Sequence, residues 1–209
     1  MNITFIFFLG LIVGIIGVIP PGLLNMTAAK ISLKEGYGRG IVFSVGVCLI
    51  VFVQTYVASI FAKYLSNHQE VIDILQRVAF VIFVLITIYY LFIAKQQAKP
   101  HIEPQVRSKQ SRFFHGMFLS SINVFPIPFQ AYMTITLASF RWMDFSTTSI
   151  ISYVAGTGMG TFVMLYVYIF FFDKIKNKPF ASQKSMNYSI GIITGVISII
   201  TLINIIKEL

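Results

Sequence analysis

The chain has 209 residues, of which 56% are hydrophobic and only 11% are charged, and its formal net charge is +9. Soluble domains contain roughly 25% charged residues, so this composition excludes a soluble globular protein and indicates an integral membrane protein. The single cysteine, Cys48, lies inside an apolar segment. One cysteine excludes both an intramolecular disulfide and a thiolate metal cluster.

Six apolar stretches reach the length of about 20 residues that a membrane-spanning helix needs. They cover residues 3–19 (extending to about 30 if the first helix runs on), 40–62, 71–94, 113–140, 149–172 and 187–206. These stretches and their connections use up the chain. The sequence therefore predicts an all-α, polytopic membrane protein with six transmembrane helices in one integral membrane domain, 1–209. No lysine or arginine precedes Lys30, so we expect the first stretch to be a retained helix rather than a signal peptide.

Most of the 16 basic residues fall in the loops after the first, third and fifth stretches. The positive-inside rule places such loops in the cytoplasm. The sequence thus predicts a multi-pass protein of the cytoplasmic (inner) membrane with both termini outside. The basic excess is explained by topology, and we expect no nucleic-acid partner.

Two of the stretches are interrupted by prolines at corresponding places. The first ends in VIPPGLLN, residues 18–25, and the fourth contains SINVFPIPF, residues 121–129. Six helices form two triplets of opposite orientation, because three is odd. We therefore predict two inverted three-helix repeats, about 1–94 and about 113–209, joined by a cytoplasmic loop, 95–112. Interrupted helices in matching positions of two halves are typical of a transporter's binding site.

Prolines in these interruptions should free backbone carbonyls, because proline has no N–H to donate four residues back. The carbonyls expected to lose their partners are those of Ile16, Gly17, Ile122 and Val124. In a membrane such groups must line a wet cavity or find polar partners. New helices are expected to begin near Gly22 and Phe129, with N-terminal amides that attract a carboxylate. The alternative is a pair of ordinary proline kinks satisfied by neighbouring helices.

The segment PPGLLNMTAAKISLKEGYGRG, residues 20–40, resembles the N-terminal signature of the LysE/RhtB amino-acid exporter family. The length, the six apolar segments and the motif near Asn123 also fit that family. The residues that match are Pro21, Gly22, Gly36, Gly40 and Asn123. The family's usual PGPN and Asn-Pro-Lys motifs are altered here. The resemblance implies a secondary exporter of amino acids or related small metabolites.

The predicted substrate site combines the interruptions with polar residues of the neighbouring helices. It consists of Pro21, Gly22, Asn25, Gln54, Asn123, Pro126, Pro128 and Gln130. For each lone amide the alternative is an interhelical hydrogen bond. All seven acidic residues fall in loops or at helix ends, so the membrane interior is expected to lack a carboxylate. We therefore predict a substrate that is neutral overall, such as a zwitterionic amino acid.

Other features are given structural interpretations. His115 is expected to be a solvated anchor, and Lys30 either draws a carboxylate or serves only as a positive-inside residue. Four Gly-x-x-x-Gly patterns are assigned to close helix packing, and the one in the last helix is a candidate homodimer face. The patterns are Gly10/Gly14, Gly36/Gly40, Gly156/Gly160 and Gly191/Gly195.

The functional prediction is an exporter that works by alternating access. The alternatives are a pore-like channel and a non-transporting membrane assembly subunit. No catalytic residue, metal ligand or cofactor is predicted, because the three histidines lie near loops and no buried acid accompanies them.

Overall fold

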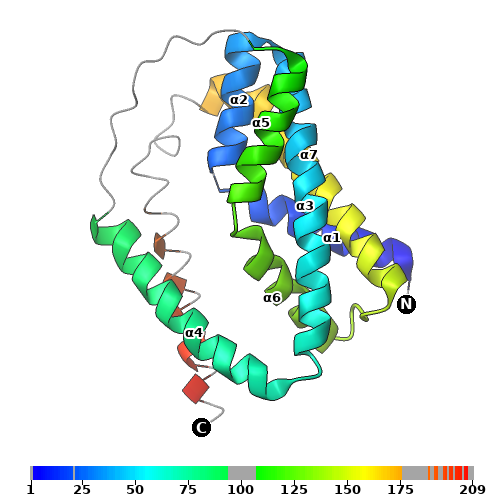
Figure 1. Ribbon diagram of the computed structural model, residues 1–209, viewed down its shortest axis with the longest axis vertical. Coiled ribbons are helices and arrows are strands. Elements are labelled where there is room, and N and C mark those ends of the chain that lie inside the picture. The colour runs from blue at the N-terminus through cyan, green and yellow to red at the C-terminus, as the bar shows by residue number, and fades with distance from the viewer. Residues whose placement is uncertain are drawn as a thin grey trace. The chain divides into compact units, whose positions relative to one another are not determined.

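A computed structural model describes residues 2–20, 22–93, 107–175 and a series of helical positions between 188 and 206, and these residues contain helices and no strand. Figure 1 shows the helices in chain order. They are α1 (Ile3–Val18), α2 (Leu23–Glu35), α3 (Tyr37–Leu65), α4 (Gln69–Ile88), a π-helical turn (Tyr89–Ile93), α5 (Lys109–Ile122), α6 (Pro126–Ser139) and α7 (Thr147–Ile175). The all-helical prediction is confirmed over these residues.

The chain divides into two compact units. Unit 1 comprises Met1–Tyr64 and Glu103–Lys174, and unit 2 comprises Leu65–Ile102 and Ile175–Leu209. Unit 1 contains every described helix except α4, the π-helical turn and the C-terminal helical residues. In unit 2 the position of a Cβ added to Gly191 would lie 2.6 Å from Leu91 Cδ2. Unit 1 also contains both proline interruptions, the one between α1 and α2 and the one between α5 and α6.

Helix length and composition support the expectation of membrane-spanning segments. Among the described residues, α3 and α7 are each long and apolar enough to cross a membrane. The α1–α2 pair adds a third span if it is counted as one broken helix, whose two parts are bent by 79°. The arrangement of six spans stays a prediction.

Both predicted interruptions are present. The first apolar stretch ends at Val18 and a new helix begins at Leu23, with Gly22 as its N-cap. The fourth stretch is likewise divided, between Ile122 and Pro126. The second restart was predicted near Phe129, and that position was wrong by about one turn. Pro126 starts α6 because the first turn of a helix has no partner for its N–H groups, so a proline is tolerated there.

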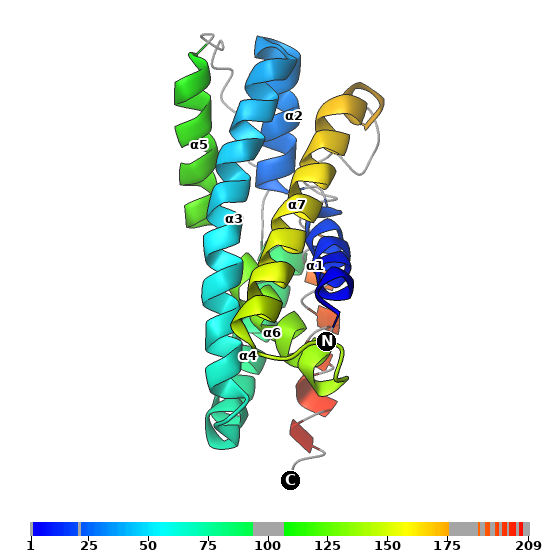
Figure 2. The same ribbon diagram turned by 90° about the vertical axis from the view of Figure 1, so that its right-hand side faces the viewer.

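Two helices of 29 residues each, α3 and α7, run through unit 1 in opposite directions. The ring of Tyr37 at the start of α3 contacts that of Tyr166 near the end of α7, with centroids 6.0 Å apart. Figure 2 shows α2 and α5 near one end of these long helices and α1 and α6 near the other. Each interruption therefore lies between the two ends of unit 1.

Close packing in unit 1 joins α1 to α7. A Cβ added to Gly10 would overlap the carbonyl of Tyr153, and one added to Gly156 would overlap the carbonyl of Phe7. Each helix thus presents a glycine to the other's backbone. The prediction that these glycines serve helix packing is confirmed, and the same holds for Gly160, which lies against Leu11.

The same arrangement joins α5 to α3. A Cβ added to Gly116 would overlap the carbonyl of Phe43, and one added to Gly46 would overlap the carbonyl of Phe113. In all four helices the carbonyl that meets a glycine belongs to an aromatic residue three positions before the helix's own glycine. The α1–α7 and α5–α3 pairs are therefore packed alike, residue by residue.

Gly36 departs from the packing prediction. A Cβ at this position would meet nothing within 4 Å, so the residue is not a close-packing contact. It ends α2 with φ at 99°, a conformation that favours glycine over every other residue. Gly36 thus forms the turn between α2 and α3. Its partner in the pattern, Gly40, does serve close packing, because a Cβ added there would lie 2.8 Å from Ser32 Cβ.

Candidate functional site

Asn25 holds the first interruption together. Its side-chain nitrogen donates to the carbonyls of Val18 at 3.0 Å and Pro20 at 2.9 Å. Its side-chain oxygen accepts from the N–H groups of Gly22 at 2.6 Å and Met26 at 2.9 Å. The side chain is 2% exposed. Asn25 was predicted to line the substrate site, and the four hydrogen bonds of its amide all go to the backbone of its own helix break.

Two other groups at the first interruption also have partners. The hydroxyl of Tyr168 in α7 donates to the carbonyl of Ile19, the C-cap of α1, at 2.7 Å. The carbonyl of Ile16 accepts from the N–H of Ile19 at 3.3 Å, so the prediction that proline leaves it unpaired was wrong. The carbonyls of Val18, Ile19 and Pro20 thus find polar partners within the protein, which is one of the two outcomes expected in a membrane.

Gln54 plays the corresponding role at the second interruption. Its side-chain nitrogen donates to the carbonyl of Asn123, the C-cap of α5, at 2.9 Å and to that of Ser120 at 3.1 Å. The carbonyl of Val124, also predicted to be unpaired, accepts from the N–H of Ile127 at 3.1 Å. For Gln54 the interhelical hydrogen bond, which was the alternative interpretation, is present.

Of the other predicted site residues, Pro126, Pro128 and Gln130 lie in α6, and Gly22 lies just before α2. Gln130 in α6 accepts a hydrogen bond from the hydroxyl of Tyr153 at 2.6 Å, and both side chains are buried. Pro126 and Pro128 lie in the first turn of α6. Pro21 lies outside the described residues. Gly22 precedes α2 as its N-cap.

The two interruptions meet through an apolar contact. A Cβ added to Gly17, in the last turn of α1, would lie 3.0 Å from the ring of Phe129, in the first turn of α6. Phe129 in turn stacks on Phe125, with ring centroids 5.9 Å apart. The broken ends are thus neighbours, as expected for a common site, and the contact between them is an aromatic ring.

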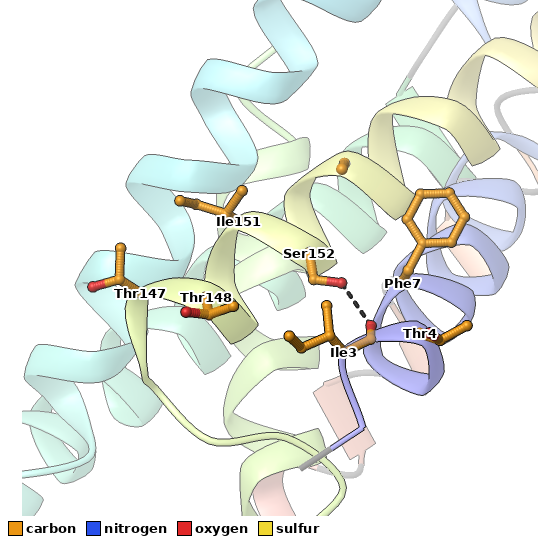
Figure 3. A pocket seen from close by; sticks show the side chains of 8 residues that line it. Ile3, Thr4, Phe7, Thr147, Thr148, Ile151 and Ser152 are labelled. Carbon is orange, nitrogen blue, oxygen red and sulfur yellow. Dashed lines mark hydrogen bonds between the residues drawn. The ribbon is translucent and has the colours of Figure 1, made fainter.

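The pocket found in unit 1 lies elsewhere than predicted. Figure 3 shows it at the starts of α1 and α7, where the Ser152 hydroxyl donates to the Ile3 carbonyl at 2.7 Å. Its volume is about 450 Å³, and it is open to the outside. It is lined by Ile3, Thr4, Phe7, Thr147, Thr148, Ile151, Ser152 and Ala155. This pocket therefore lies at the opposite end of α1 from the interruption.

A buried ion pair occupies the other end of unit 1. Glu35, the last residue of α2, is 8% exposed, and both of its carboxylate oxygens bind the Arg112 guanidinium of α5, one of them Nε at 2.8 Å. Arg39 of α3 donates to the carbonyl of Glu35 at 2.7 Å and to that of Arg107 at 2.8 Å. Glu35 was grouped with acids in loops and at helix ends. It is indeed at a helix end, but it is buried rather than solvated.

His115 belongs to the same cluster. The Nη1 group of Arg112 lies 3.1 Å from His115 Nδ1. Arginine can only donate, so Nδ1 accepts and a neutral imidazole would carry its proton on Nε2. The ring also packs edge-on against Phe43, with centroids 5.5 Å apart. The prediction of a solvated anchor was therefore wrong, because the imidazole is half buried between α3 and α5.

The sequence did not indicate the roles of Tyr168 or of the Glu35–Arg112 pair. Tyr168 was not singled out, because one tyrosine in an apolar helix is usually interpreted as part of an aromatic belt. The Glu35–Arg112 pair was missed because its members are far apart in sequence. The available signal for the pair was an acid at the end of α2, next to the Gly36 turn that leads into an apolar helix.

Comparisons with protein-family models, curated proteins and solved structures gave no match. Within the described part of the chain, no group of three or more histidine, cysteine or acidic side chains could hold a metal ion. The arrangement of the two interruptions is therefore the main basis for an argument about function.

Proposed function

We propose that the protein is a secondary transporter of the cytoplasmic membrane that exports a small amino acid or a related zwitterionic metabolite by alternating access. One observation carries the proposal. The two proline breaks lie together, because a Cβ added to Gly17 in α1 would lie 3.0 Å from the ring of Phe129 in α6. The C-cap carbonyls beside them are held in the same way, that of Ile19 by Tyr168 of α7 and that of Asn123 by Gln54 of α3. Broken helices that face a common centre are typical of transporters with inverted repeats.

The repeated packing supports the inverted-repeat part of the proposal. The glycine contacts between α1 and α7 recur between α5 and α3 at equivalent positions. One turn further on, Gly14 lies against the carbonyl of Thr157, and at the equivalent place the Ser120 hydroxyl donates to the carbonyl of Val47 at 3.3 Å. The segment from α1 to α3 and the segment from α5 to α7 thus resemble each other in their helix contacts as well as in hydropathy.

This packing also favours a particular division into moving parts. The first helix of each half is packed against the third helix of the other half through backbone contacts at glycine, which leave no room for sliding. The bodies that move are therefore α1 with α7 and α5 with α3. Two triplets that rock as blocks would have to separate these contacts.

The Glu35–Arg112 pair closes one end of the proposed pathway. It joins α2 to α5, and Arg39 adds α3 through the carbonyl of Glu35. The positive-inside rule assigns this end to the cytoplasm. Access from the cytoplasm would then require the pair to open, so the arrangement represents a state closed on that side.

Neutral polar groups surround the interruptions. The side chains that bind them are Asn25, Gln54 and Tyr168, none of which carries a charge at neutral pH. A lysine or arginine side chain bound here would have no carboxylate partner and would carry a large desolvation cost. A zwitterion, whose own charges offset each other, suits this environment better.

Counterflow in proteoliposomes tests the proposed function. Vesicles that contain the purified protein are loaded with one unlabelled amino acid at a time, and uptake of the same labelled compound is followed. A saturable overshoot for neutral amino acids, absent from empty vesicles, is expected. A flux that stays proportional to concentration would support a pore, and no flux for any compound would support an assembly subunit.

A further inference from the structure

Three buried polar atoms in the described residues have no hydrogen-bond partner: Gln54 Oε1, Thr55 Oγ1 and Thr157 Oγ1. Several other buried hydroxyls bond to a carbonyl of their own helix four residues back, as Ser44, Ser59 and Thr134 do. Polar atoms buried without a partner are rare and call for an explanation. Gln54 is the most informative, because its amide also contacts a helix break.

The orientation of the Gln54 amide is determined by its partners. Its nitrogen faces the carbonyls of Ser120 and Asn123, and carbonyls can only accept. The opposite orientation would place three acceptors together, so Oε1 must be the free atom. The side chain is 7% exposed, and an unpaired buried acceptor costs about 1–3 kcal/mol. The site thus holds an acceptor that lacks a donor or a cation.

The C-terminal end of α5, whose carbonyls the Gln54 amide contacts, favours a positive charge, whereas α6 begins three residues after Asn123 with the opposite dipole end. The end of α5 presents carbonyls beyond the last turn, and the helix dipole makes this end negative. Arg112 is the nearest permanently charged residue on α5, eleven residues before Asn123, which corresponds to roughly 16 Å at 1.5 Å per residue. Uncharged oxygens alone suit a monovalent cation better than a divalent one, which usually takes carboxylates.

We propose that the broken end of α5 binds a small monovalent cationic group through Gln54 Oε1 and the adjoining backbone carbonyls. This proposal rests on the transport function above, because unwound carbonyls and the C-terminal ends of half-helices coordinate cations in transporters. Two sources share this chemistry. One is an alkali ion that drives export, and the other is the ammonium group of the substrate.

Thermal unfolding of the purified full-length protein in detergent tests the proposal without a transport assay. Unfolding is compared in equal concentrations of sodium, potassium, methylammonium and choline chlorides. A ligand that binds the folded state raises the unfolding temperature. We expect a rise of several degrees over choline in the alkali arms if the ion is inorganic, or in the methylammonium arm if the site takes the substrate's amino group.

Variants assign the effect to Gln54. Gln54→Met fills the same space without an oxygen, and Gln54→Lys supplies a tethered ammonium group that can donate to the same carbonyls. Both should lose the cation-dependent rise, whereas Ser59→Ala, one turn further along α3, should keep it. Equal unfolding temperatures in all four salts, or a rise that persists in Gln54→Met, would overturn the proposal. Cation binding without counterflow would refute the transport function instead.

Discussion

Glu35 and Arg112 form a two-point ion pair although 77 residues separate them in the chain. The carboxylate lies at the end of α2 and the guanidinium in the first turn of α5, and both are buried. Removal of one partner leaves the other charge buried and unpaired, which costs about 3–5 kcal/mol. The pair therefore makes a strong prediction about stability.

We expect Glu35→Ala and Arg112→Ala each to lower the free energy of unfolding by about 3 kcal/mol or more. Unfolding in detergent, followed by circular dichroism, measures the change. Arg77→Ala, at an exposed position of α4, is the matched control and should change stability by less than about 0.5 kcal/mol. Similar values for Glu35→Ala and Arg77→Ala would show that the pair is solvated.

Equivalent glycines should respond alike. A methyl group on Gly10 or Gly116 would overlap a backbone carbonyl of the facing helix, so both alanine variants should lose about 1–3 kcal/mol of stability through overpacking. Gly38→Ala is the control, because its Cβ would lie 3.8 Å from the nearest atom, Lys109 Cε. If only one of the two equivalent glycines is sensitive, the proposed repeat is not reflected in the packing energy.

Asn25 should be sensitive to the loss of its donors. Asn25→Asp keeps two acceptors but places a carboxylate against the carbonyls of Val18 and Pro20. We expect it to destabilise the protein at least as much as Asn25→Ala, by about 2 kcal/mol or more. A functional role as the acceptor for a substrate ammonium predicts the reverse, with Asp tolerated and counterflow retained. Unfolding and counterflow on the same preparations distinguish these outcomes.

Substitution of Asn123 by alanine distinguishes the role of its backbone carbonyl from that of its side chain. Its carbonyl accepts from Gln54, and Asn123→Ala retains that carbonyl. We therefore expect the variant to unfold at nearly the wild-type temperature. Reduced counterflow in a normally folded Asn123→Ala protein would place the side chain in the substrate pathway. Unchanged counterflow would remove Asn123 from the predicted site.

The predicted topology can be checked by cysteine labelling in intact cells. Cys48 is buried, and Cys48→Ala provides a background without thiols. Phe140→Cys, in the exposed connection between α6 and α7, should react with a membrane-impermeant maleimide from outside. Arg107→Cys, just before α5, should react only after the membrane is permeabilised. The opposite pattern would reverse the orientation of the chain.

Local chemistry explains why the helix interruptions could be predicted. Prolines and a glycine N-cap act within a few residues, and both breaks occur within the proline motifs, although α6 begins at Pro126 and not near Phe129. The interior partners could not be predicted in the same way. Which side chain reaches a freed carbonyl depends on how α3 and α7 pack, and nothing near Tyr168 in the sequence indicates that its hydroxyl binds Ile19.

The predicted site residues show the same division. The amides of Asn25, Gln54 and Gln130 were identified as polar residues of the interior, and all three are buried. Their roles were predicted less well, because the helix breaks need donors and acceptors of their own. Asn25 and Gln54 bind backbone groups of the helix breaks, whereas Gln130 accepts from the Tyr153 hydroxyl. Gln54 Oε1 is a fully buried amide atom without a partner.

The crossed glycine contacts have a consequence for biosynthesis. The surface of α1 around Gly10 receives its partner, Tyr153, only after the ribosome has translated most of the polypeptide. Until then this small-residue surface lacks its final partner. The contacts between α1 and α7 therefore form late, after the segment that contains α7 has been synthesised.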